Sequence, residues 1–368
     1  MGNLARISDQ NGWALARKPF HGYDQSVADA VTQLTLVDIA RLAGVGLATA
    51  SRALNDDKGV SAATRARVLA VAAEHSYVVS PEAARLARGG VRRVAIVTPH
   101  LSRWFFGEMV EAIVTVLRAA DIDVLLYTVS SVHDRHDFFD KLPARRKVDA
   151  VIVVGFQVED SERERLELLK VHVVAAGGQH AVYPNVCIDD RRAGRQAMDH
   201  LIFLGHRRIA MIEAVDPDQP TEHSGRSSAY YAALADAEIP LDRDLIVSTP
   251  WGGEHGAEAM ATLLSLRDPP TAVYIHSDEV ALGALRSVQR SGLSVPGDIS
   301  IVGIDDHPLS ALVDLTTVAQ PVREQGQRAA QMLIDLLEGR EAAEREITVP
   351  TRLVIRGSTG PPRGGARA

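Results

Sequence analysis

Short apolar runs alternate with helical stretches over most of this 368-residue chain. Seven such runs follow the first ninety residues: VAIVTP, VLLY, AVIVVG, VVAAG, IAMI, TAVYI and ISIVGID, beginning near positions 94, 124, 150, 173, 209, 271 and 299. Nearly continuous apolar strands between helices are typical of a parallel sheet covered on both faces. Seven or more strands need two sheets, so we expect an α/β core of two doubly wound parallel-sheet lobes. Ligands of such sheets bind beyond the carboxyl ends of the strands, which here means the cleft between the lobes.

The segment that begins at Thr35 has helical spacing instead. Thr35 as N-cap with Asp38 three residues later approaches a capping box. Gly44-Val45-Gly46 ends this helix, residues 47–54 form a second one, and Ser61 caps a third. Two short helices joined by a tight glycine-containing turn are typical of a helix-turn-helix, whose second helix lies in the major groove of DNA. We therefore predict an all-α headpiece; the alternative is a small helical bundle with no DNA role.

The distribution of charge supports a DNA-binding headpiece. The whole chain carries −7, but Thr35 to Arg93 holds nine Lys and Arg against five Asp and Glu, and the remainder from Val94 carries −11. A small basic module on a large acidic one suits a DNA-binding head whose core does not wrap DNA. Any solvated helical domain could carry the same excess of positive charge.

Polar side chains of the second helix are suited to contact DNA. Thr49, Ser51 and Arg52 can offer hydrogen bonds to phosphates or base edges. Thr35 and Asn55, which flank the two helices, complete this part of the predicted DNA-binding set.

A fourth short helix is expected after Tyr77. Ser80-Pro81 places a cap before a proline at the first helical position, and Gly89-Gly90 follows Arg88. A helix of barely two turns is marginal alone and needs a partner to form.

The segment TLVDIARLAGVGLATASRALN resembles the headpiece of the lactose-repressor and purine-repressor family of bacterial transcription regulators. The likeness continues through DHLIFLGHRRIAMI, TAVYIHSDEVALGAL, VPGDISIVGIDD and LVIRGS, to about residue 358. It implies a periplasmic-binding-protein-like core and an allosteric regulator whose affinity for operator DNA responds to a small molecule.

The resemblance also implies roles for single residues. The two base-reading positions correspond to Leu47 and Ala48, which are apolar and would read thymine methyls or groove shape. Arg52 matches the family's arginine, and Leu86 matches the hinge leucine that wedges into the minor groove and kinks the duplex. The alternative for Leu86 is that it packs on the core.

Four core residues are predicted to bind the effector. Asp278 follows a strand and is expected to cap a helix and point into the cleft, while Arg226 opens another helix. A carboxylate and a guanidinium suit adjacent hydroxyls of a sugar, and Trp104 or Phe105 offers a stacking face. The alternatives are a plain helix cap for Asp278 and a surface ion pair for Arg226.

Other patterns in the sequence give little support for nucleotide binding, metal binding or catalysis. Gly44 to Thr49 resembles a dinucleotide fingerprint but no strand precedes it, and neither His133 with His136 nor Asp305-Asp306-His307 offers a full set of metal ligands. Since no catalytic elbow or Walker loop occurs, we expect no enzyme, no metal and no cofactor. The single cysteine, Cys187, is expected to be a buried thiol in a reducing compartment.

The expected organisation is a flexible extension (1–34), a headpiece (35–79), a hinge helix and linker (80–91), a two-lobed ligand-binding and dimerisation core (92–358) and a flexible tail (359–368). The predicted function is a cytoplasmic repressor, dimeric or tetrameric, that binds a palindromic operator and a sugar or sugar derivative, without a membrane. The competing function is a sugar-binding transport receptor, which would share the core but lack the headpiece and carry a secretion signal. A third possible function is an α/β enzyme whose substrate binds in the cleft.

Overall fold

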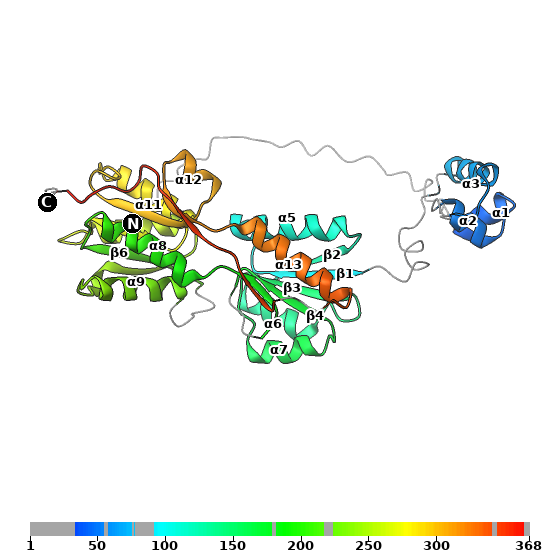
Figure 1. Ribbon diagram of the computed structural model, residues 1–368, viewed down its shortest axis with the longest axis horizontal. Helices are drawn as coiled ribbons and strands as arrows, with labels where there is room; N and C mark the ends of the chain where they lie inside the picture. Colours follow the sequence, from blue (N-terminus) through cyan, green and yellow to red (C-terminus); the bar gives the residue numbers. More distant parts are fainter. Residues whose placement is uncertain are drawn as a thin grey trace, which may run out of the picture. The chain divides into compact units, whose positions relative to one another are not determined.

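The computed structural model describes residues 34–54, 58–75, 77, 92–178, 182–216, 224–340 and 344–363 (Figure 1). They fall into two compact units, one up to Gly90 and one from Val91. The predicted hinge helix and linker at 80–91, with Leu86, lie outside the described residues, as do Asn55 and all but the last residue of the predicted extension at 1–34.

The described part of the first unit contains three helices, α1 (Leu36–Leu42), α2 (Leu47–Leu54) and α3 (Ala62–Glu74). The expected capping box is present, because Thr35 and Asp38 exchange hydrogen bonds, and Ser61 caps α3. Gly44 has a φ of +62°, a left-handed conformation that favours glycine, and thereby makes the sharp turn between α1 and α2. A small core of Ile39, Val68 and buried alanines holds the helices together.

The second unit contains two six-stranded sheets, each at the centre of one lobe. The first-lobe sheet has the order β11-β5-β4-β3-β1-β2, and its neighbouring strands pair in parallel. Its strands are β1 (Arg93–Thr98), β2 (Asp123–Thr128), β3 (Ala150–Val154), β4 (His172–Ala176), β5 (Asn185–Cys187) and β11 (Glu346–Thr348).

The second-lobe sheet has the order β12-β10-β9-β8-β6-β7, in which β12 alone pairs antiparallel. Its strands are β6 (Ile209–Val215), β7 (Ile246–Pro250), β8 (Ala272–Ile275), β9 (Ser300–Asp305), β10 (Thr316–Ala319) and β12 (Arg352–Val354). All seven predicted strands are present. The five others, β5, β7, β10, β11 and β12, were not predicted.

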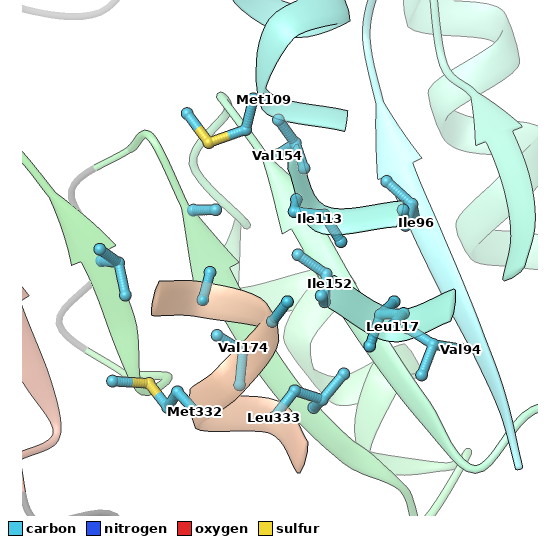
Figure 2. Close-up of a cluster of buried hydrophobic side chains, with 14 of the residues drawn as sticks. Val94, Ile96, Met109, Ile113, Leu117, Ile152, Val154, Val174, Met332 and Leu333 are labelled. Carbon is cyan, nitrogen blue, oxygen red and sulfur yellow. The ribbon is translucent and has the colours of Figure 1, made fainter. Parts of the chain in front are cut away.

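Helices cover both faces of each sheet, as the apolar strands require. In the first lobe, α5 (Trp104–Ala119) and α13 (Val322–Leu337) pack on one face (Figure 2), and α6 (Val132–Lys141) and α7 (Asp160–Glu167) on the other. The two faces use alternate strand residues, so Val94 and Ile96 meet α5 while Ala95 and Val97 meet the opposite layer.

The second lobe repeats this arrangement. α8 (Asp190–Phe203) and α9 (Gly225–Asp236) cover one face, and α10 (Gly253–Leu264) and α11 (Asp278–Arg290) cover the other. The short helix α12 (Pro308–Leu312) follows β9.

The chain passes between the lobes three times: after β5, after β10 and after β11. Each lobe is therefore built from segments that are distant in the sequence.

A flexible tail was expected at 359–368, but residues 359 and 360 are held by hydrogen bonds. The hydroxyl of Thr359 lies 2.8 Å from Nε2 of His200, and the carbonyl of Gly360 lies 2.8 Å from Nε2 of His206. These contacts attach residues 359 and 360 to the second lobe.

Candidate functional site

The outward face of α2 carries four of the eight predicted DNA-binding residues. Leu47 is 50% exposed, and Ala48 and Arg52 are exposed beside the partly buried Ser51. Positions 47, 48, 51 and 52 share one face at helical spacing, whereas Ala50 and Ala53 are buried against the neighbouring helices. One side of α2 is therefore exposed, and the other packs in the core of the headpiece.

The remaining predicted residues of the headpiece lie differently. Thr49 is partly buried, and Thr35 is exposed at the start of α1. The Thr35 hydroxyl donates to Oδ2 of Asp38 at 2.7 Å, so this side chain already serves the helix cap.

A cavity of about 270 Å³ lies between the two lobes of the second unit. Its walls come from the loops that follow β1, β3 and β4 in the first lobe and β6, β7, β8 and β9 in the second. This is the position expected for a ligand of parallel sheets. The volume lies near the lower end of the ~300–1,000 Å³ range of ligand pockets, which indicates a small compound.

The aromatic residues predicted for the effector line this cavity. Trp104 and Phe105 form the first turn of α5 and reach the cavity with Phe106. Trp251, which follows β7 and was not singled out from the sequence, adds an indole from the second lobe.

Arg226 also lines the cavity, near the start of α9. Its Nε donates to Oδ1 of Asp190 at 2.8 Å, its Nη1 donates to the carbonyl of His276, and Nη1 lies 3.9 Å from Oδ1 of Asp305. Burial alone would lower the pKa of Arg226, but Asp190 and Asp305 raise it above its usual value. The guanidinium is thus a fixed positive charge in the cavity wall, and the surface ion pair that was the alternative is not what the structure shows.

The prediction that Asp278 caps a helix and points into the cleft is wrong. Ser277 is the N-cap of α11, and Asp278 is fully buried behind the cavity wall. Oδ2 of Asp278 accepts from the Ser310 hydroxyl at 2.6 Å and from the His307 backbone N–H at 3.0 Å, and Oδ1 accepts from the Thr317 hydroxyl at 2.7 Å. Burial raises the pKa of Asp278 against these hydrogen bonds. The carboxylate ties α11 to the segments around α12 and β10.

Asp305 is one of the cavity carboxylates that the sequence interpretation missed. It ends β9 and lines the cavity, where Gln320 donates to its Oδ1 at 2.5 Å. Burial raises the pKa of Asp305 to about 7, against the lowering effect of Arg226. Its position at the carboxyl end of a buried strand was the available signal.

The backbone at the end of β9 is strained. Asp305 has a φ of 137° and Asp306 a φ of 59°, values that side chains other than glycine rarely adopt. Arg356 donates to Oδ1 of Asp306 at 2.5 Å and holds this turn. Strain of this kind is concentrated at binding sites, where the surrounding structure fixes it.

Glu279 connects the two lobes at the cavity. Its Oε1 accepts from the backbone N–H of Trp104 at 3.0 Å, and its Oε2 accepts from Nε of Arg103 at 3.4 Å. The Arg103 guanidinium lies 4.5 Å from the ring centre of Trp251. These contacts join the two lobes beside the cavity.

The cysteine, possible metal sites and possible membrane helices were also considered from the sequence. Cys187 is buried, and burial raises the pKa of its thiol to about 11. Among the described residues, no three His, Cys, Asp or Glu side chains are grouped so as to hold a metal ion. No helix in the described part of the chain has both the length and the apolar character to cross a membrane.

Comparison with known proteins identifies both units. Residues 35–80 match the family described as bacterial regulatory proteins, lacI family, and residues 198–359 match the periplasmic binding protein-like domain. The HTH-type transcriptional repressor CytR of Escherichia coli strain K12 is 33% identical over 332 residues, which cover 89% of this chain and 97% of that protein. The chain belongs to the lacI family of bacterial regulators.

Solved structures agree with this assignment. The lac repressor dimer bound to operator and the anti-inducer ONPF has a TM-score of 0.76 at 27% identity and covers 89% of this chain and 99% of that one. The transcriptional regulator CelR–cellobiose complex has a TM-score of 0.65 at 30% identity, and the match covers 88% of this chain and 99% of the CelR chain. As a lacI-family member, the protein is a DNA-binding transcription regulator and not an enzyme.

Proposed function

We propose that this protein is a cytoplasmic, dimeric transcriptional repressor whose affinity for a palindromic operator is controlled by a sugar bound between the core lobes. The observation that carries the proposal is the cavity, because Trp104 and Phe105 of one lobe face Arg226 and Asp305 of the other. Buried charged groups beside aromatic rings suit a ring that has hydroxyls on its edge and C–H groups on its faces.

Relatives support the finer parts of the proposal. CytR is named as a repressor, the lac repressor structure is a dimer on operator DNA, and the CelR structure holds cellobiose. A transport receptor, the competing function, has no use for the headpiece.

The proposed switch follows from the two-lobed cavity. A ligand changes DNA affinity only if it binds one arrangement of the lobes better than the other. A sugar that contacts both walls favours the closed arrangement, and closure in a dimer changes the separation of the two segments that lead to the headpieces. DNA binding requires one particular separation of these two segments. An inducer disfavours that separation, and a corepressor favours it.

The experiment combines DNA selection with anisotropy. The full chain selects its operator from a randomised DNA pool, and the operator is then titrated with and without each sugar of a panel. We expect one sugar to change operator affinity; if none does, the proposed effector class is wrong.

Arg226→Ala tests the cavity. Loss of a hydrogen-bonded charge costs about 1.5–3 kcal/mol, so the variant should lose the sugar response and still bind operator. Arg195→Ala is the control, because Arg195 pairs with Asp199 at 2.6 Å on the exposed side of α8. If Arg226→Ala responds to the sugar as the parent does, the ligand binds elsewhere.

A further inference from the structure

Acidic groups outnumber basic ones in the wall of the cavity. Among the described lining residues, Asp190, Asp216, Glu279 and Asp305 supply carboxylates, whereas the guanidiniums come from Arg103 and Arg226. The wall therefore carries more negative than positive charge.

Both guanidiniums are already held by protein acceptors. Arg226 is paired with Asp190, and Arg103 with Glu279 at 3.4 Å while its guanidinium stacks on Trp251. An acidic ligand would have to compete with these carboxylates for the same N–H groups, and it would lie beside the carboxylates that it displaced.

The remaining titratable groups do not reverse this balance. Burial lowers the pKa of His100, and burial lowers the pKa of His276 to about 3, so both imidazoles are neutral at pH 7. Burial raises the pKa of Asp305 to about 7, but with Asp305 protonated three carboxylates still face two guanidiniums.

We propose that the cavity rejects sugar acids and sugar phosphates and takes a sugar without an acidic group, with preference for one that carries an ammonium group. The inference rests on the proposed function, since it names the chemical class of the effector at the same cavity. Like charges placed together in a desolvated site cost several kcal/mol, so an acidic sugar should bind about 100-fold more weakly than its uncharged counterpart.

The first experiment compares matched ligands on the full-length protein by calorimetry at pH 7. The sets are glucose, glucosamine, glucuronate and glucose 6-phosphate, with the corresponding galactose and mannose series. Within each set, we expect the amino sugar to bind most tightly, the neutral sugar less tightly and either acidic sugar most weakly. A uronate or a phosphate that binds as tightly as its neutral counterpart overturns the proposal.

The second experiment measures the charge of the cavity without any sugar. Trp104 and Trp251 line the cavity, and Trp13 is the remaining tryptophan. In a Trp13→Phe background, iodide should quench the fluorescence about threefold less than caesium does, after both are scaled to free tryptophan, because a negative wall excludes the anion.

Asp216→Asn and Glu164→Gln make a matched pair for the quenching measurement. Asp216 lines the cavity, whereas Glu164 is exposed on α7, and each substitution removes one negative charge. Only Asp216→Asn should raise quenching by iodide. Equal quenching by the two ions in the parent, or equal effects of the two variants, overturns the inferred charge.

The two experiments separate two kinds of failure. If no sugar of any charge binds, the proposed sugar effector is wrong, and the quenching measurement still decides the sign of charge in the cavity. If sugars bind but acids bind best, the sugar effector stands and the inferred charge selection falls.

Discussion

Asp278 and Glu279 are neighbours at the start of α11 and have different surroundings. Successive helix residues point about 100° apart, so one carboxylate is buried against Ser310 and Thr317 while the next reaches the cavity. A sequence locates the helix start after β8, but the rotation of the helix about its axis depends on the packing of the whole lobe. This is why the cavity could be predicted from strand ends while its carboxylates could not.

Asp278→Ala should reduce stability instead of effector affinity. The substitution leaves two buried hydroxyls and one backbone N–H without an acceptor, at an expected cost of about 2–4 kcal/mol in the free energy of unfolding. Gly303 permits this packing, because a Cβ at position 303 would collide with Oδ1 of Asp278. Urea unfolding is the measurement, with the exposed Asp236→Ala as control. A variant of parental stability would contradict the role assigned to Asp278.

Asp305 should make stability depend on pH. Because burial raises its folded pKa to about 7 from 3.8, the folded protein holds a proton that the unfolded chain has released between these values. The free energy of unfolding should therefore decrease as pH rises from about 5 to 7. Asp305→Asn should flatten this decrease, which urea titrations at pH 5, 6, 7 and 8 would measure. An unchanged pH profile in the variant would assign the effect to other groups.

At the scale of elements, the headpiece was the most predictable part. The bounds of α2 agree with the expected 47–54, because a glycine turn before the helix and the local spacing of alanines define it. Six of the seven predicted strands are mostly buried apolar runs, and β2 is an apolar run that is only partly buried. The strands β5, β11 and β12 have only three residues each, too few for a pattern. The strands β7 (IVSTP) and β10 (TTVA) are half polar or interrupted by proline, so they do not form apolar runs.

Arg52→Ala tests the outward face of α2. If Arg52 reads a base, its loss should weaken operator binding by about 1–3 kcal/mol and relax specificity at one position, which DNA selection with the variant would reveal. Arg67→Ala removes one charge from the exposed side of α3 and serves as control. Weaker binding to operator and random DNA in equal measure would make Arg52 a phosphate contact instead. Leu47 and Ala48 remain predicted readers of thymine methyls.

At the scale of the whole molecule, we predict that Glu279 sets the balance between open and closed lobes. Its hydrogen bonds to Arg103 and the Trp104 backbone join α11 of one lobe to α5 of the other. Glu279→Ala should favour the open arrangement and weaken sugar binding about three- to tenfold, as expected for one partly buried contact.

Small-angle scattering and calorimetry would test this prediction together. Glu108→Ala is the control, because Glu108 pairs with Arg323 at 2.6 Å inside the first lobe. The radius of gyration without ligand should increase only in Glu279→Ala. If both variants behave like the parent, the contacts across the cavity have no part in closure.

The three crossings between the lobes have a consequence for synthesis on the ribosome. β11 and β12 lie within residues 346–354 and give each sheet one of its edge strands. A nascent chain thus leaves β5 and β10 without these neighbours until residues 346–354 have been translated. Products of premature termination would expose an unpaired strand edge in both lobes at once, and exposed edges are the starting points of aggregation. For this topology, a stop codon just before position 346 would leave both lobes incomplete.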